Sequence, residues 1–283
     1  MRHCIDSYGN VVTNSYSRIK VSVNGSGKEV ILVLGRKTSP SSITEMKPLV
    51  HFLEDQYTVV TLDYPGSGSS DNYHSMRTLD NITRELHEVM ELLGYTKYTI
   101  VSLAYAGLYS LYYANKYADE IRAVVGIDSF VAEQRKNKIR EENLRFVNDI
   151  LTEFHNAAFA QWIAEKAAAQ YLKGTKSYTY AQDEIEIYSN TAAYMYRNMT
   201  LLDEYKCPDE NFKTLDNISY PLHIPVLFIL STRRSRRIKD WYELHKKLSE
   251  NDSSKIITLK GGKNQHLRHP ERLAKEIKDF LPR

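Results

Sequence analysis

The segment of residues 98–117 most constrains the fold of this 283-residue chain. It opens with Tyr-Thr-Ile-Val, a β-branched and aromatic run that predicts a strand, and it ends in a helical pattern at residues 108–117. Only a short turn separates the two elements. A turn this sharp is strained and needs small residues two positions before and after its apex, a requirement that Ser102 and Ala106 meet. The sequence therefore predicts Ala104 at the apex.

Short apolar strands alternate with helices on both sides of this turn. Continuous apolar strands separated by helices are typical of a parallel sheet that is covered on both faces. We therefore predict an α/β fold with a mostly parallel, doubly wound sheet. The expected strands are residues 18–23, 29–34, 57–62, 98–101, 123–127, 226–230 and 255–259, and the expected helices are residues 43–53, 78–93, 108–117, 239–248 and 271–281.

The middle of the chain has a different pattern. Residues 131–219 contain no strand signal and predict only helices, at residues 133–154, 157–172 and 183–199. A helical block that interrupts a doubly wound sheet indicates a lid over the carboxyl ends of the strands, where such folds bind ligands. We expect a core formed by residues 1–130 and 220–283 and a helical cap formed by residues 131–219.

Composition excludes several classes of partner. The net charge of +3 is too small to indicate a nucleic-acid partner. No apolar run approaches the length of a membrane span and the N-terminus lacks an apolar signal region, so we expect no membrane partner and a cytoplasmic location.

Two cysteines, Cys4 and Cys207, fit a reducing compartment. No grouping of cysteine and histidine has metal-ligand spacing, so we expect no metal and no cofactor. The oligomeric state stays open.

Four segments in order resemble the α/β-hydrolase fold superfamily, and the resemblance covers nearly the whole chain. The strand at residues 29–34 ends in Leu-Gly-Arg-Lys, where this fold commonly has His-Gly. The strand at residues 57–62 leads into Asp-Tyr-Pro-Gly-Ser-Gly-Ser-Ser-Asp, which is similar to the superfamily's Asp-x-x-Gly-x-Gly-x-Ser. The turn at Ala104 follows, and then Gly126-Ile-Asp128, as in small esterase-like bacterial hydrolases with a helical cap.

The resemblance implies a serine nucleophile, a histidine, an acid and two backbone N–H donors that stabilise an oxyanion. Ala104 occupies the nucleophile position, and its methyl group can neither attack a carbonyl nor transfer a proton. The amides of Arg36 and Tyr105 are the candidate oxyanion donors. Backbone donors survive almost any side-chain change, so they are weak evidence of retained activity.

The histidine position has two candidates. Hydrolases of this kind have a Gly-x-His turn, and a Pro or Ser that introduces the last helix follows the histidine by seven positions. Counting back from Pro270 gives Lys263, which places an amine where the imidazole would be. His266 is the alternative if the loop is three residues shorter, although it lacks the small residue that usually precedes the catalytic histidine.

The acid position is also substituted. The usual site after the seventh strand falls on Arg234, and a guanidinium cannot accept the N–H of an imidazole. A known variation places the acid after the sixth strand, where Asp128 stands. The other interpretation of Asp128 is a cap for the start of the lid, together with Ser129. If Asp128 lies near Lys263, we expect the two to form an ion pair.

These substitutions predict a relative of serine ester hydrolases that is catalytically inactive and binds a small ligand under the cap. Lys263 and Arg36 would give the pocket positive charge and favour an anionic ligand such as a carboxylate. One alternative is an enzyme with a rebuilt site, in which Lys263 forms Schiff bases. Another is a Ser-to-Ala variant of an active carboxylic ester hydrolase.

Overall fold

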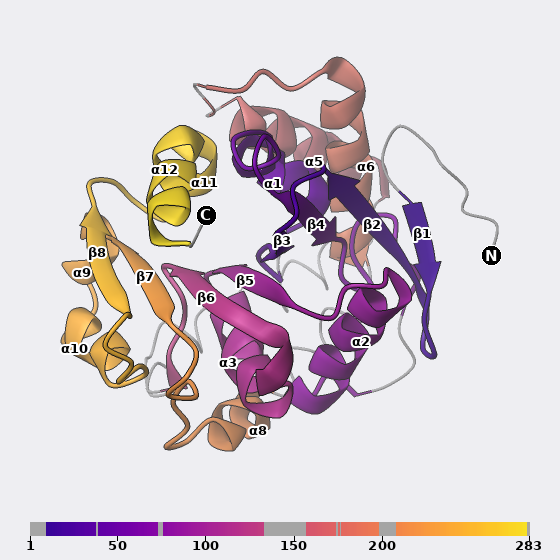
Figure 1. Ribbon diagram of the computed structural model, residues 1–283. Helices are drawn as coiled ribbons and strands as arrows, with labels where there is room; N and C mark the ends of the chain where they lie inside the picture. Colours follow the sequence, from indigo (N-terminus) through magenta and orange to yellow (C-terminus); the bar gives the residue numbers. More distant parts are fainter. Residues whose placement is uncertain are drawn as a thin grey trace.

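The computed structural model describes residues 10–37, 39–72, 76–132, 157–173, 175, 177–197 and 208–281. These residues form an eight-stranded sheet between two layers of helices (Figure 1). The strand order is β1-β2-β4-β3-β5-β6-β7-β8, and all neighbours from β4 to β8 are parallel, whereas β1 and β2 pair antiparallel at one edge. The strands are β1 (Asn10–Thr13), β2 (Arg18–Asn24), β3 (Val30–Leu34), β4 (Thr58–Leu62), β5 (Tyr98–Leu103), β6 (Ile121–Ile127), β7 (Val226–Ser231) and β8 (Lys255–Leu259).

One face of the sheet is covered by α1 (Ser42–His51) and α12 (Pro270–Phe280), with the short α11 (Gln265–Arg268) beside them (Figure 1). The first turn of α1 is fixed by Ser41, whose hydroxyl accepts the N–H of Thr44 and donates to Asp63 at 2.9 Å. Proline at the first position of α12 suits a helix start because its missing N–H has no intrahelical partner there. Apolar side chains of both long helices pack on the strands in one buried cluster.

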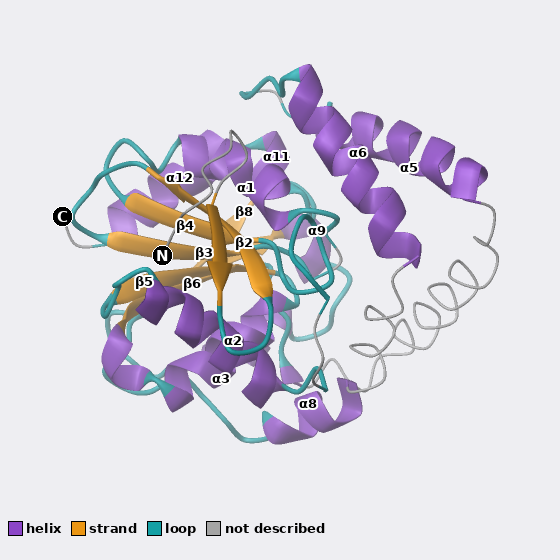
Figure 2. Cartoon of the chain, turned by 90° about the vertical axis from the view of Figure 1, so that its right-hand side faces the viewer, coloured by secondary structure: helices purple, strands orange, loops and turns teal. Residues whose placement is uncertain are grey.

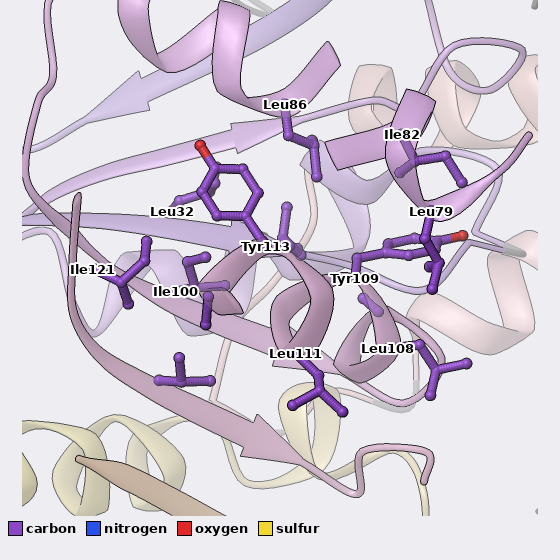
Figure 3. Packing of buried hydrophobic residues seen from close by; sticks show 14 of the residues in the cluster. Leu32, Leu79, Ile82, Leu86, Ile100, Leu108, Tyr109, Leu111, Tyr113 and Ile121 are labelled. Atoms are coloured by element: carbon purple, nitrogen blue, oxygen red, sulfur yellow. The ribbon is translucent and has the colours of Figure 1, made fainter. Parts of the chain in front are cut away.

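The opposite face is covered by α2 (Leu79–Leu92), α3 (Ala106–Lys116), α8 (Pro208–Thr214) and α10 (Trp241–Lys246). Thr78 caps α2 by accepting the N–H of Asn81. Figure 3 shows how leucines and isoleucines of α2 and α3 pack with the strands around Tyr109 and Tyr113. Two short elements complete this part of the chain, the 3-10 helix η1 (Ala118–Glu120) and α9 (Thr232–Ser235). The two apolar clusters hold the sheet rigid, so the turns at its carboxyl ends are fixed in place.

The helices α5 (Ala157–Leu172) and α6 (Gln182–Arg197) lie side by side outside the two layers (Figure 2). Tyr180 donates to the carbonyl oxygen of Thr44 in α1 at 3.0 Å, and Lys47 of α1 forms an ion pair with Glu184. A small apolar cluster joins both helices to Leu267 of α11. The pair therefore packs against α1 and α11.

The predicted fold class is confirmed. Strands β2 to β8 and helices α1, α2, α3, α5, α6, α10 and α12 all appear within a few residues of their expected positions. The turn at residue 104 is sharper than predicted, because β5 continues to Leu103 and α3 already starts at Ala106. The helix expected at residues 133–154, like Cys4 and Cys207, lies outside the described residues.

Candidate functional site

The structure places Ala104 at the apex of the turn between β5 and α3. Its φ of 54° is left-handed, a conformation that costs about 1 kcal/mol or more for a residue with a Cβ. Three backbone hydrogen bonds fix the turn. The N–H of Ala104 donates to Ile127 at 2.9 Å, and its carbonyl accepts from Gly107 at 3.0 Å and Phe130 at 2.9 Å. A partly buried methyl group is all that the apex presents.

The hydroxyl nearest to the apex in sequence points elsewhere. Ser102 is fully buried and lies 3.0 Å from the hydroxyl of Ser110, which in turn contacts the hydroxyl of Tyr220 at 3.0 Å. The three hydroxyl groups lie where β5, α3 and the segment before β7 pack together. The Ser102 hydroxyl is therefore directed into the core and not toward the apex at Ala104.

Both candidate oxyanion residues lie at the carboxyl ends of neighbouring strands. Arg36 follows β3 and Tyr105 follows β5, and these two strands pair directly. The ammonium group of Lys37, a buried residue, lies 4.2 Å from the centre of the Tyr105 ring, which is within the range of a cation–π interaction. The Tyr105 ring also contacts Phe130 edge to face at 5.8 Å.

The side chain of Arg36 has a role that the sequence did not reveal. It forms an ion pair with Glu45 of α1 at 2.6 Å and contacts the hydroxyl of Tyr171 in α5. Burial alone would raise the pKa of Glu45, but the Arg36 charge and a hydrogen bond from His266 outweigh it and hold the pKa well below its usual value. Glu45 is therefore ionised and is the counter-ion of Arg36.

His266 is the second partner of this carboxylate. Its Nε2 lies 2.8 Å from Glu45 Oε1 and 3.4 Å from the hydroxyl of Tyr171, and the side chain is fully buried. Burial lowers the pKa of His266 against the opposing effect of Glu45. The imidazole is thus neutral and donates through Nε2, which makes it part of the contact between α1 and α11.

Lys263 lies in the loop between β8 and α11, at the surface. Partial burial lowers its pKa, and so do the charges of Arg36, Arg234 and Arg237, whereas Glu45 opposes the shift. Within the part of the chain that the structure describes, no ion pair joins Lys263 to Asp128. Oδ1 of the Asp128 carboxylate instead accepts a backbone N–H.

Asp128 follows β6 and is almost fully buried. Its φ is 45°, and its Oδ1 accepts the backbone N–H of Ser231 at 2.7 Å. The carboxylate therefore joins the ends of β6 and β7. Asp128 and Ser129 lie beside the turn at Ala104, since a Cβ placed on Gly107 would stand 2.5 Å from that of Ser129.

Arg234, which the sequence places at the usual acid position, lies at the same edge of the sheet as Asp128. Its guanidinium lies 4.5 Å from the centre of the Phe130 ring and 5.2 Å from that of Trp241. Nη1 donates to the backbone carbonyl of Asp128 at 3.3 Å. Burial lowers the pKa of Arg234, with Asp128 opposing. The only signal in the sequence was an arginine-rich turn directly after a fully apolar strand.

A metal site is not found among the described residues. These residues contain no group of three or more histidine, cysteine, aspartate or glutamate side chains that could hold a metal ion. No helix within them is long and apolar enough to cross a membrane. Two open depressions, of 580 Å³ beside α12 and 330 Å³ between α5 and α11, are lined by residues other than Ala104. Neither depression therefore lies at the turn between β5 and α3.

The family model described as alpha/beta hydrolase fold matches residues 36–195. The chain belongs to this family. The match begins at Arg36, two residues after β3, and includes the turn at Ala104, helix α5 and most of α6. The turn at Ala104 therefore belongs to an alpha/beta hydrolase fold.

Solved structures with the same fold cover nearly the whole chain. ALR0039 from Nostoc sp PCC 7120, assigned as an alpha/beta hydrolase, is 15% identical with a TM-score of 0.77, covering 95% of this chain and 96% of that one. A Pseudomonas aeruginosa protein assigned as an epoxide hydrolase is 15% identical with a TM-score of 0.74, covering 96% and 94%. A variant of the epoxide hydrolase of Vigna radiata is 16% identical with a TM-score of 0.73, covering 99% and 98%. At these identities the likeness shows the fold alone.

Among curated proteins, the uncharacterized protein YbdG of Bacillus subtilis is 24% identical over 127 residues. The match covers 44% of this chain and 39% of YbdG, so the chain matches well under half the length of that relative.

Proposed function

We propose that this hydrolase-fold protein binds a small anionic ligand at the carboxyl edge of its sheet and does not hydrolyse esters. The observation that carries the proposal is the methyl group of Ala104 at the apex of the turn, with φ 54°. Removing one member of a catalytic triad typically costs about 10⁴-fold or more in rate. Ser102 is turned into the core, so it cannot supply the missing hydroxyl.

The charges around the turn support an anionic ligand. Lys263 has Arg36, Arg234 and Arg237 as neighbours, and Glu45 is the acid that most affects it. Glu45 is already paired with Arg36 at 2.6 Å. Lys263 therefore sits in a surplus of positive charge, and an anion bound there would relieve the repulsion among these cations.

The enzymatic part is tested with p-nitrophenyl acetate. We expect the purified protein to give no turnover above that of Ala104→Gly, which serves as the matched control because neither side chain can attack an ester. We expect Ala104→Ser combined with Lys263→His to gain weak esterase activity. Turnover at the level of a serine hydrolase that survives Ala104→Gly would overturn the proposal. Restoration by Ala104→Ser alone would instead identify a Ser-to-Ala variant of an active carboxylic ester hydrolase.

A second function is favoured by the position of Lys263 among the charges of Arg36, Arg234 and Arg237, which together with partial burial lower its pKa. A lysine with a lowered pKa has more of the free amine that attacks a carbonyl carbon; loss of water then gives an imine. Borohydride would reduce the imine by hydride transfer to a stable secondary amine. Treatment with benzaldehyde and borohydride, followed by peptide mass measurement, tests this function. A single adduct at Lys263, absent from Lys263→Gln and retained in the exposed-site control Lys260→Gln, would support it; adducts spread over many lysines would count against it.

A further inference from the structure

Arg234 and Lys263 come from two turns that are hydrogen-bonded to each other. The N–H of Arg233 donates to the carbonyl of Gly261 at 3.0 Å, and the N–H of Gly261 donates to Thr232 Oγ1 at 3.1 Å. These bonds hold the turn after β7 against the loop after β8. The two cations are therefore kept close together by rigid backbone and not by chance contact of flexible side chains.

Aromatic rings orient the Arg234 guanidinium. Phe130 and Trp241 both lie within the cation–π range of it, at 4.5 and 5.2 Å from their ring centres, and Trp241 is buried. Phe130 also contacts Tyr105, the residue directly after Ala104, so one aromatic ring separates Arg234 from the turn. A guanidinium held by rings in this way keeps its edge for hydrogen bonds in its own plane.

Arg234 is short of a counter-ion. Its hydrogen bond to the Asp128 carbonyl is long, at 3.3 Å, and within the described residues no carboxylate forms an ion pair with it. A partly buried cation without a paired carboxylate is costly, because burial removes hydration that one long hydrogen bond replaces only in part. Arginine cannot escape this cost by losing its proton. An anion is the group that would complete this site.

Buried polar atoms gather in the same corner of the fold. Within the described protein groups, four of them have no hydrogen-bond partner: Asp128 Oδ2, Ser129 Oγ, Ser231 Oγ and Trp241 Nε1. Buried polar groups are nearly always hydrogen-bonded in proteins, so such a concentration is unusual. Ser231 binds Asp128, Ser129 follows Asp128 in the chain, and the Trp241 ring contacts Arg234, so the polar groups around the guanidinium are incompletely satisfied by the described protein groups.

We infer that Arg234 is the specificity-determining residue of the ligand site and binds a monocarboxylate through its guanidinium edge, with Lys263 as the second cation. The inference rests on the proposed function and names its ligand class. A flat carboxylate matches the in-plane hydrogen bonds of a guanidinium. The nearby Asp128 carboxylate disfavours a dianion such as a phosphate ester, because repulsion grows with the charge of the ligand.

Calorimetric titration with benzoate, benzamide and phenyl phosphate tests the inference. We expect saturable binding of benzoate at one site, no heat with its neutral counterpart benzamide, and weaker binding of phenyl phosphate. Arg234→Gln should weaken benzoate binding about 10-fold or more, because a charge-assisted hydrogen bond is lost. Arg234→Lys should also weaken it, since an ammonium group cannot bind a carboxylate in the same fork. The control is Arg236→Gln, an exposed arginine two positions away, which should leave the affinity within about twofold.

Fluorescence gives a readout that needs no change at Arg234. The chain has two tryptophans, and Trp162 is exposed, so Trp162→Phe leaves Trp241 as the reporter. We expect benzoate to change the fluorescence emission of Trp241. The dissociation constant from this titration should equal the one from calorimetry. An emission unchanged at saturating benzoate would contradict binding at Arg234 even if the Arg234 variants fail to fold.

The outcomes separate the inference from the proposed function. Benzoate binding that is kept by Arg234→Gln but lost in Lys263→Gln would leave an anion site and overturn the role of Arg234. Tighter binding of phenyl phosphate than of benzoate would overturn the carboxylate class alone. If neither anion binds the unmodified protein, the inference and the anionic-ligand part of the proposed function both fall.

Discussion

His266 Nε2 lies 2.8 Å from Glu45 Oε1, although the two residues are 221 positions apart and neither side chain is exposed. The same carboxylate oxygen accepts from Arg36 at 2.6 Å and from the hydroxyl of Tyr171 at 2.6 Å. One oxygen of α1 therefore joins the turn after β3, the helix α11 and the helix α5. One residue separates Lys263 from the start of α11, so this contact also positions the loop that carries Lys263.

Glu45→Ala should lower the free energy of unfolding by about 3–5 kcal/mol, because it leaves the mostly buried charge of Arg36 without its partner. Urea denaturation measures the change. Glu271→Ala is the matched control, since Glu271 is likewise in the first turn of its helix but is exposed. The control should lose no more than about 1 kcal/mol. Equal losses in the two variants would show that the buried contact adds little.

His266 should make stability depend on pH. Its pKa in the folded state lies below the unfolded value of about 6.5, so the folded protein favours the neutral ring. Its contribution is complete above pH 6.5 and declines as the pH falls toward the folded pKa, because the unfolded chain binds a proton that the folded one does not. The loss approaches about 1.4 kcal/mol per pH unit in that window.

Urea denaturation between pH 8 and pH 5 measures this effect. His266→Asn should flatten the profile, whereas His269→Asn, at an exposed position in the same segment, should keep it. A profile of the same slope in His266→Asn would assign the pH dependence to other groups.

The sequence predicted those parts of the fold that repeat an apolar pattern. β3, with five buried apolar residues, and α5, with the same bounds as expected, are examples. β1 was missed because Asn10–Thr13 is short and pairs with a single neighbour at the edge. α9 and α11 have four residues each, fewer than periodicity can detect.

The site was harder to predict because its contacts are distant in sequence. Ala104 was found from its small neighbours, which reflect the local backbone. Glu45 was missed because a single acid in a helix resembles any solvated acid until its partners Arg36 and His266 are placed beside it. Counting positions led to Lys263 and Asp128 separately, but it could not show that Asp128 Oδ1 accepts the backbone N–H of Ser231.

Ala104→Gly should raise the free energy of unfolding by about 0.5 kcal/mol, because glycine relieves the left-handed backbone by more than it adds to the entropy of the unfolded chain. Ala114→Gly, inside α3, should instead lower it by about 1 kcal/mol or more. Thermal and urea denaturation of both variants give the comparison. A loss at position 104 as large as that at 114 would mean that the methyl group of Ala104 matters more for packing than for strain.

Gly126 and Gly107 both leave room for Ser129. A Cβ on Gly126 would lie 2.6 Å from Ser129 Oγ and 2.9 Å from the Phe228 ring, and a Cβ on Gly107 would lie 2.5 Å from Ser129 Cβ. Each Gly-to-Ala change should therefore cost about 1–3 kcal/mol through overpacking.

Ser129→Ala tells the two clashes apart. It removes Oγ but keeps Cβ, so it should recover more of the stability lost in Gly126→Ala than of that lost in Gly107→Ala. Ser129→Ala alone should cost little, because its Oγ has no hydrogen-bond partner among the described protein groups. Urea denaturation of the two double-mutant cycles measures both coupling energies. Equal recovery in the two cycles would show that the backbone near Ala104 shifts to make room, and that the turn is less rigid than its hydrogen bonds indicate.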